Sequence, residues 1–185
     1  GDCGACTILV GSLNENKMKY QSVNSCLMPL GQAEGKHIVT IEGLSSHELS
    51  IIQQSFVDEG GTQCGFCTPG FIVSLSGYLL ENDQYNLEDA IDSIGGNVCR
   101  CTGHTTIKQA VKNIIDKVSS EVISHKDKLV SLKNLGIIPE YFTEIEPQLI
   151  EIQKKNFSRE FEQKTDFIVA GGTDLFVQKE HELRK

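Results

Sequence analysis

Basic clusters are the feature that this sequence most clearly lacks. Its 17 lysine and arginine residues are outnumbered by 25 aspartate and glutamate residues, which gives a formal net charge of −8 at pH 7. A protein that binds nucleic acid needs a cationic face to neutralise phosphates. Because no stretch of the chain supplies one, the sequence predicts a protein without a nucleic-acid partner.

Long apolar stretches are absent as well. A helix that crosses a bilayer needs about 20 mostly apolar residues, and no run in this sequence approaches that length. The residues from Gly1 onward also do not form the basic and then apolar pattern of a secretory signal. We therefore expect a cytoplasmic protein with no membrane partner.

The 7 cysteines lack the even number and the wide spacing of a disulfide framework. Four of them stand in two tight pairs instead. Cys64 and Cys67 form a C-x-x-C within GGTQCGFCTPG, and Cys99 and Cys101 form a C-x-C within GNVCRCTG. The intervening segment is long enough for two helices, which could fold back and bring the two pairs together.

Four converging thiolates would bind either zinc or an iron–sulfur cluster. Structural zinc sites usually take two C-x-x-C-like pairs. A C-x-C pair is more typical of a cluster, in which neighbouring thiolates can bind different irons. The favoured interpretation is therefore an iron–sulfur cluster, and the alternative from another class is a zinc-stapled binding module without a redox role.

A second cysteine set opens the chain. Cys3 and Cys6 have C-x-x-C spacing within GDCGACTILVG, and Cys26 follows further along. Plant-type [2Fe–2S] ferredoxins use C-x4-C-x2-C and then a distant cysteine. In that pattern these three are the second, third and fourth ligands, so we expect the first ligand and the early strands to precede Gly1 in a longer protein.

Residues 1–44 show the alternation of a small sheet. Residues 7–11 and 19–24 predict a hairpin around the polar residues 14–17, and residues 37–41 predict a third strand that ends at Glu42 and Gly43. Together with the glycines around Cys3, this pattern predicts the later part of a β-grasp ferredoxin-type domain.

Residues 45–118 show helical spacing of apolar residues in four successive segments. We expect Ser45 or Ser46 to cap the first helix, Pro69 to lie in the first turn of an apolar core helix, and Asn86 to cap the third. The apolar positions that should face the core are Leu49, Ile52, Phe56 and Val57 in the first helix, Leu87, Ala90, Ile91 and Ile94 in the third, and Ile107, Ala110, Val111, Ile114, Ile115 and Val118 in a fourth that begins at Thr105 or Thr106. The sequence thus predicts an α+β protein with a four-helix bundle around the second cysteine set.

Residues 119–160 are rich in lysine and glutamate and predict a linker. Within it, IIPEYF at residues 137–142 is expected to dock on the protein, and a helix is expected from Pro139 or Glu140 to about residue 152. Residues 166–170 then predict a buried strand that ends in paired glycines and a threonine. Such a turn exposes amide groups to a pyrophosphate, although an ordinary strand-to-helix turn has the same pattern.

The three cysteine motifs in this order, followed by IVAGGTDL at residues 168–175, resemble the xanthine dehydrogenase family of molybdenum hydroxylases. Within that family the chain is most similar to the bacterial small subunit, which carries iron–sulfur and FAD segments on one chain. The resemblance implies two [2Fe–2S] clusters and makes residues 161–185 the start of an FAD-binding domain that continues beyond Lys185. The implied ligands are Cys3, Cys6 and Cys26 for one cluster and Cys64, Cys67, Cys99 and Cys101 for the other, with FAD contacts at Val169, Ala170, Gly171, Gly172, Thr173, Asp174 and Leu175.

The resemblance also implies a function for the whole assembly. Electrons would pass from a molybdopterin centre on a large partner subunit, through the bundle cluster and then the ferredoxin-type cluster, to FAD and NAD. The substrate would be a purine, or an aldehyde if the relative is an aldehyde oxidase, and the heterodimers would form a higher oligomer. This chain would hold no catalytic residue. Gln63 would contact the pterin, although an exposed amide is the ordinary alternative, and His104 stands where the family commonly has tyrosine.

Overall fold

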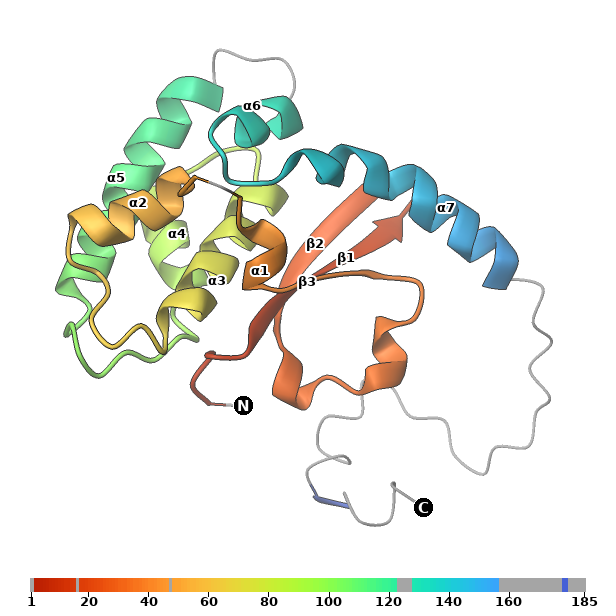
Figure 1. The fold of residues 1–185 in the computed structure, drawn as a ribbon, viewed down its shortest axis with the longest axis horizontal. Coiled ribbons are helices and arrows are strands. Elements are labelled where there is room, and N and C mark those ends of the chain that lie inside the picture. The colour runs from red at the N-terminus through yellow and green to blue at the C-terminus, as the bar shows by residue number, and fades with distance from the viewer. Residues whose placement is uncertain (1, 16, 47, 123–127, 157–177, 180–185) are drawn as a thin grey trace.

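A small antiparallel sheet packs against a group of helices in the computed structural model, which describes residues 2–15, 17–46, 48–122, 128–156 and 178–179. The described fold is mixed helix and sheet, as expected (Figure 1). The elements in chain order are β1 (Thr7–Asn14), β2 (Lys17–Asn24), the 3₁₀ turns η1 (Ser25–Leu27) and η2 (Leu30–Ala33), β3 (His37–Val39), α1 (Ile41–Leu44), α2 (Ile51–Asp58), α3 (Thr68–Glu81), α4 (Leu87–Ser93), α5 (Thr105–Val122), α6 (Lys128–Asn134), the 3₁₀ turn η3 (Glu140–Glu144) and α7 (Ile145–Asn156).

The sheet has the order β2-β1-β3, and both neighbouring pairs are antiparallel. The predicted hairpin is confirmed, with Thr7 opposite Asn24 and Asn14 opposite Lys17. The predicted third strand is wrong at its end, because β3 stops at Val39 and the chain turns into α1. That short helix buries Leu44, so packing on the core decides the conformation of residues that alternate like a strand.

Helix α3 is the centre of the core, as its composition predicts. Every residue from Gly70 to Leu80 is buried, because the helix packs on the sheet as well as on neighbouring helices. It approaches the sheet at Gly77, where an added Cβ would overlap the hydroxyl of Ser22 and lie 2.9 Å from Leu9 Cδ2. The helix therefore joins the sheet and the bundle into one packed unit.

Helix α2 begins later than predicted. Ser50 caps it, since its hydroxyl accepts from the backbone N–H of Gln53 at 3.2 Å while the Gln53 side chain accepts from the backbone N–H of Ser50 at 2.8 Å. The expectation of a cap at Ser45 or Ser46 is therefore wrong. Leu49 and Val57 are 56% and 54% exposed, because Leu49 precedes the helix and Val57 lies beside the buried stripe.

The predicted cap of the third helix and the predicted buried face of the fourth are both confirmed. Asn86 caps α4 by accepting from the backbone N–H of Asp89 at 2.8 Å. Helix α5 starts at Thr105 and buries all six of its predicted apolar positions. It packs along α2, where the hydroxyl of Ser55 donates to the carbonyl of Ala110 at 3.0 Å.

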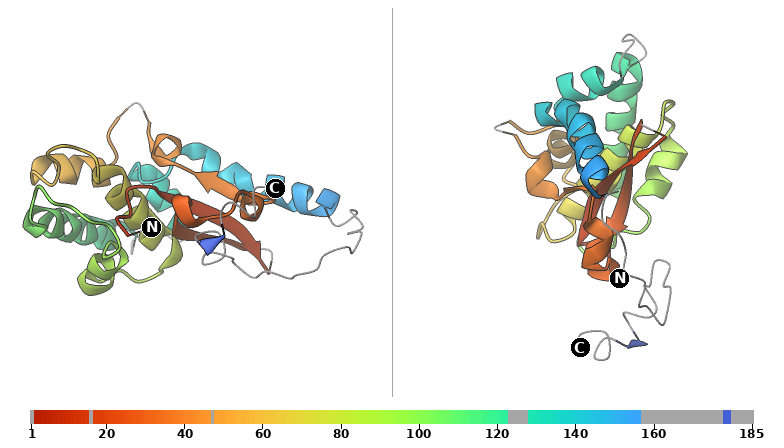
Figure 2. Two further views of the ribbon diagram at one scale, coloured as in Figure 1. Left: turned by 90° about the horizontal axis from the view of Figure 1, so that it is seen from below. Right: turned by 90° about the vertical axis from the view of Figure 1, so that its right-hand side faces the viewer.

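The segment after α5 returns to the sheet. It contains α6, which buries Leu132, and then Ile137 and Ile138, which are both buried, so the predicted docking of IIPEYF is confirmed. The helix predicted after Pro139 starts as η3 and continues as α7, which lies along the sheet beside β1 (Figures 1 and 2). No helix among the described residues is long and apolar enough to span a membrane. The strand and turn predicted at residues 166–175 lie outside the described residues.

Candidate iron–sulfur sites

The four cysteines of the bundle come together from two loops. Cys64 and Cys67 lie between α2 and α3, while Cys99 and Cys101 lie between α4 and α5. The Sγ atoms of Cys64 and Cys101 are 3.6 Å apart, and both residues are exposed. Cys67 and Cys99 are buried and form a second interacting pair. The predicted convergence is therefore present, in the form of an outer pair and an inner pair.

The first of these loops is shaped by residues that are not ligand candidates. Gly60 ends α2 with a φ of +63°, and Gly65 lies between the two cysteines with a φ of +81°, a region that favours glycine. The hydroxyls of Thr62 and Thr68 are 2.9 Å apart and close the loop at its base. The turn therefore keeps Cys64 at the surface while Cys67 points into the core.

The second loop is organised by Thr102. Its Oγ1 lies 3.3 Å from Cys99 Sγ and accepts from the backbone N–H of His104 at 3.3 Å. Gly103 and His104 follow, both with a φ of 67°. The ring of His104 packs edge-on against Phe71, which anchors the end of the loop on α3. A hydroxyl beside a thiol and a tight turn thus fix the C-x-C pair at the start of α5.

The electrostatics divide each pair into a more acidic and a less acidic thiol. Burial opposes ionisation of Cys99, yet hydrogen bonds from Thr102, Cys101 and Cys67 lower its pKa to about 7. Burial, hydrogen bonding with Cys99 and the charge of Cys99 raise the pKa of Cys67 to about 11. In the outer pair, a backbone N–H of Phe66 and the thiol of Cys101 lower the pKa of Cys64, while donating to Cys64 raises the pKa of Cys101.

This donor set fits a centre of two metals. Two thiolates on one tetrahedral metal, each bound at about 2.3 Å, lie about 3.7 Å apart, which is close to the separation of the outer pair. Two irons held by two thiolates each are the arrangement of a [2Fe–2S] cluster with four cysteine ligands.

The first cysteine set is brought together in part. The backbone carbonyl of Cys6 accepts from the N–H of Ser25 at 3.2 Å and from its hydroxyl at 2.9 Å, so the end of β2 lies against the opening loop. Burial opposes ionisation of Cys6, but hydrogen bonds from Cys26 and Ser25 lower its pKa. Cys3 lies on the same loop as Cys6, and its side chain is exposed.

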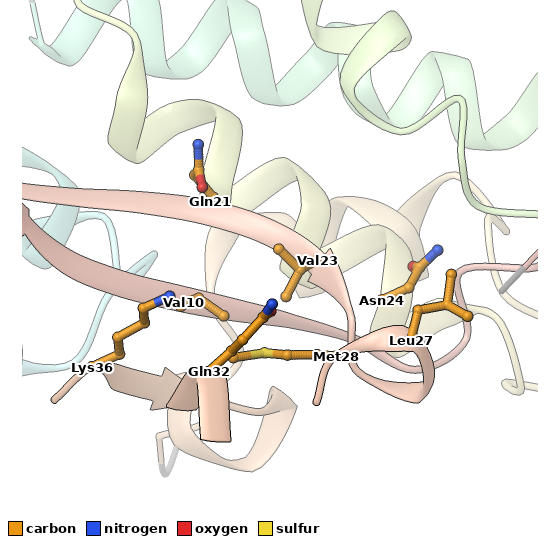
Figure 3. A pocket seen from close by; sticks show the side chains of 8 residues that line it. All are labelled: Val10, Gln21, Val23, Asn24, Leu27, Met28, Gln32 and Lys36. Carbon is orange, nitrogen blue, oxygen red and sulfur yellow. The ribbon is translucent and has the colours of Figure 1, made fainter. Parts of the chain in front are cut away.

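A cavity of about 340 Å³ is lined in part by Leu27 and Met28, the two residues that follow Cys26 in the chain (Figure 3). It separates the sheet, which contributes Val10 and Val23, from the η1 and η2 segment, which contributes Met28 and Gln32. Cys26 itself lies in η1, where its side chain is exposed and hydrogen-bonds with Cys6. No sequence pattern indicates this space, because its lining comes from strands and turns of mixed polarity.

Of the other predicted site residues, the structure describes Gln63 but not the FAD contacts. Gln63 is exposed beside Cys64. Around the same thiols, Phe66 and Val98 are 74% and 56% exposed, which places apolar side chains at the mouth of the site. The predicted FAD contacts at residues 169–175 lie outside the described residues.

Comparison with known proteins agrees with this geometry. A protein-family profile described as "[2Fe-2S] binding domain" matches residues 40–112. The chain is 41% identical over 114 residues to a probable xanthine dehydrogenase subunit of Bacillus subtilis, covering 62% of this chain and 61% of that one. It is 36% identical to the quinoline 2-oxidoreductase structure from Pseudomonas putida, with a TM-score of 0.54, covering 65% of this chain and 70% of that one.

The chain belongs to the molybdenum hydroxylase family. The xanthine dehydrogenase of rice is another relative, 40% identical over 143 residues, which are 72% of this chain and 10% of that enzyme. This chain therefore spans about a tenth of that relative's length. Its relatives in the molybdenum hydroxylase family are oxidoreductases, and the part that they share with this chain is the iron–sulfur domain.

Proposed function

We propose that this chain is the electron-transfer part of a xanthine dehydrogenase-type molybdenum hydroxylase. The observation that carries the proposal is the grouping of four bundle thiols into two contacting pairs, one of them with a sulfur–sulfur distance of 3.6 Å. A [2Fe–2S] cluster held by four cysteines accepts and releases one electron and leaves no open position for substrate. The role of these residues is therefore to conduct electrons rather than to catalyse the hydroxylation.

The cysteines would serve as ligands, and Thr102 would adjust the potential of the bundle cluster. Cys64 and Cys101 would bind the outer iron, and Cys67 and Cys99 would bind the inner iron. The hydroxyl of Thr102, 3.3 Å from Cys99 Sγ, would donate to the thiolate and tune the potential of this cluster, as hydrogen bonds to sulfur do. Cys3, Cys6 and Cys26 would supply ligands to the second, ferredoxin-type cluster.

The exposed residues around the bundle cysteines support a direction for the transfer. The outer pair is exposed, and the exposed apolar side chains of Phe66 and Val98 lie beside it, so a partner can dock where the bundle cluster is most accessible. We propose that this partner is the molybdopterin-binding large subunit, with Gln63 facing the pterin. Electrons would leave through the first cysteine set to FAD, held in part by residues 169–175, and then reach NAD.

The compartment that we propose is the cytoplasm, where thiols stay reduced and free for metal binding. The substrate that the large subunit would hydroxylate is a purine, as in the xanthine dehydrogenase relatives. Because the partner alone would contact the substrate, the same iron–sulfur part could serve an aldehyde oxidase. Activity of the complete enzyme on xanthine and on an aldehyde separates these two assignments.

Metal analysis of the purified protein tests the iron–sulfur assignment. We expect visible absorption, iron and acid-labile sulfide in equal amounts, and two distinct paramagnetic resonance signals after reduction. A colourless protein that holds zinc in place of iron would overturn the proposal and favour the zinc-stapled module.

A further inference from the structure

Asn97 is a buried amide that joins the two cysteine loops. It lies two residues before Cys99 and is 4% exposed. Its Nδ2 donates to the carbonyl of Gly4 at 3.0 Å and to the hydroxyl of Thr7 at 3.3 Å. Its Oδ1 accepts from the hydroxyl of Ser74 at 2.8 Å. The amide thus connects the Cys3 to Cys6 loop, the loop before α5, and helix α3.

The next residue adds a direct backbone link. The N–H of Val98 donates to the carbonyl of Cys3 at 2.9 Å. The residue directly before Cys99 is therefore hydrogen-bonded to the carbonyl of Cys3 itself. A continuous route of covalent bonds with a single hydrogen bond runs from one cysteine set to the other.

Two glycines allow the opening loop, the loop that contains Asn97 and helix α3 to lie in close contact. Gly4 has a φ of +68°, and a Cβ there would overlap Asn97 Nδ2 and lie 2.7 Å from the carbonyl of Gly96. A Cβ at Gly70 would overlap the carbonyl of Gly4 and lie 2.6 Å from Asn97 Nδ2. The junction has no room for another side chain, so its geometry is set by the amide and the glycines together.

We propose that Asn97 is a positioning residue for electron transfer between the two clusters, because it fixes the separation of the cysteine loops and the hydrogen bond from Val98 to Cys3. This inference rests on the proposed function. With both clusters bound, each transfer would move one electron from the reduced cluster at the bundle set to the oxidised cluster at the first set. No bond forms or breaks, and no proton moves.

The chemistry of the position requires an amide. Alanine would remove the N–H groups that reach the Gly4 carbonyl and the Thr7 hydroxyl, and it would take the acceptor away from the buried hydroxyl of Ser74. The Gly4 carbonyl would keep only its bonds from Thr7 within the same loop, so the side-chain link between the two loops would be lost. Aspartate has the same shape but would place a charge and no donor against the carbonyl of Gly4. Either change should loosen the two loops while leaving all seven cysteines in place.

The test uses the complete natural protein, purified with its clusters, as the native form and as Asn97→Ala and Asn97→Asp. Asn113→Ala is the matched control, since that amide joins α5 to the end of α2 by donating to Glu59 Oε1 at 2.5 Å and, within the part of the chain that the structure describes, has no bond to the first cysteine loop. Three quantities are measured: the magnetic interaction between the reduced clusters, both midpoint potentials, and the rate at which an electron equilibrates between the clusters after a reducing pulse. We expect the Asn97 variants to keep both signals, with a weaker interaction and a several-fold slower rate, and Asn113→Ala to match the native protein.

An unchanged interaction and rate in variants that retain both clusters would overturn the inference. If an Asn97 variant loses a cluster, Thr7→Val and Thr7→Ser decide instead, because only serine keeps the hydroxyl that accepts from Asn97 and donates to the Gly4 carbonyl at 2.6 Å. A slower rate in Thr7→Val with native behaviour in Thr7→Ser supports the inference, and equal rates in both contradict it. A native protein without two iron–sulfur signals would contradict the proposed function itself.

Discussion

The hydroxyl of Tyr20 lies 2.9 Å from Nδ1 of His37, across the face of the sheet that the segment after α6 covers. Phe142 stacks on Tyr20 with ring centroids 5.3 Å apart and meets His37 edge-on at 5.2 Å. Tyr141 extends the cluster and donates its hydroxyl to the carbonyl of Gly43 at 2.9 Å. These rings join β2, β3 and η3, so the region predicted as a linker is packed on the sheet at this point.

His37 makes this packing sensitive to pH. Burial lowers the pKa of His37 below its ordinary value of 6.5. The unfolded chain therefore binds a proton more readily than the folded one, so the stability that neutral His37 contributes is present above pH 6.5 and is lost as the pH falls through the lowered pKa. We expect chemical denaturation to show this loss in the native protein and a flatter profile in His37→Gln. Tyr141→Phe is the control, because it keeps the imidazole, and a profile in His37→Gln as steep as the native one would refute the assignment.

The cysteine assignment predicts separable losses. Cys101→Ser should remove the bundle signal in paramagnetic resonance and leave the other signal, since serine replaces one ligand of the outer iron. Cys26→Ser is the reciprocal change and should remove only the ferredoxin-type signal. Iron content should fall by about half in each variant, because each [2Fe–2S] cluster contributes two irons. Loss of both signals in either variant would show that the two sites do not form independently.

The capping box of α2 predicts a clear difference between neighbouring serines. Ser50→Ala should lower the free energy of unfolding by about 1 kcal/mol, the typical cost of losing an N-cap side chain. Ser45→Ala and Ser46→Ala serve as controls on exposed positions outside the helix and should change the stability little. Urea denaturation followed by circular dichroism measures all three, and an equal loss at Ser45 would contradict the observed helix start.

Much of the fold could be predicted because several segments have unambiguous periodicity. The 7–24 hairpin, the apolar helix α3 and the amphipathic helix α5 follow directly from alternation or helical spacing. The start of α2 could not be fixed from the sequence, because Ser45, Ser46 and Ser50 are all acceptable caps and packing of Ile52 and Phe56 selects among them. The end of β3 depends in the same way on where Leu44 reaches the core.

The candidate site could also be predicted only in part from the sequence. Spacing identified the four bundle cysteines, but it did not show that Cys64 pairs with Cys101 and Cys67 with Cys99, since pairing depends on how two loops face each other. Asn97 was missed entirely. A buried amide that bridges segments 93 residues apart in the chain leaves no local pattern, although a polar residue between the glycine pair and the C-x-C motif was a usable signal.

The contact between α3 and the sheet predicts an unusual response to glycine substitution. Replacing a helical glycine with alanine normally stabilises a helix by roughly 0.5–1 kcal/mol. Gly77→Ala should instead destabilise the protein by about 1–3 kcal/mol, because the new methyl group would overlap the Ser22 hydroxyl and press on Leu9. Gly31→Ala is the matched control, since a Cβ there meets nothing within 4 Å.

A second substitution distinguishes this overlap from a general effect on α3. Ser22→Ala removes the hydroxyl that Gly77→Ala would strike, while the Cβ of Ser22 stays 3.6 Å from the new methyl group. The double variant should therefore recover part of the stability lost in Gly77→Ala, a coupling that a double-mutant cycle of denaturation free energies measures directly. Strictly additive effects would mean that Gly77 matters for another reason and that α3 and β2 are not held at the separation described.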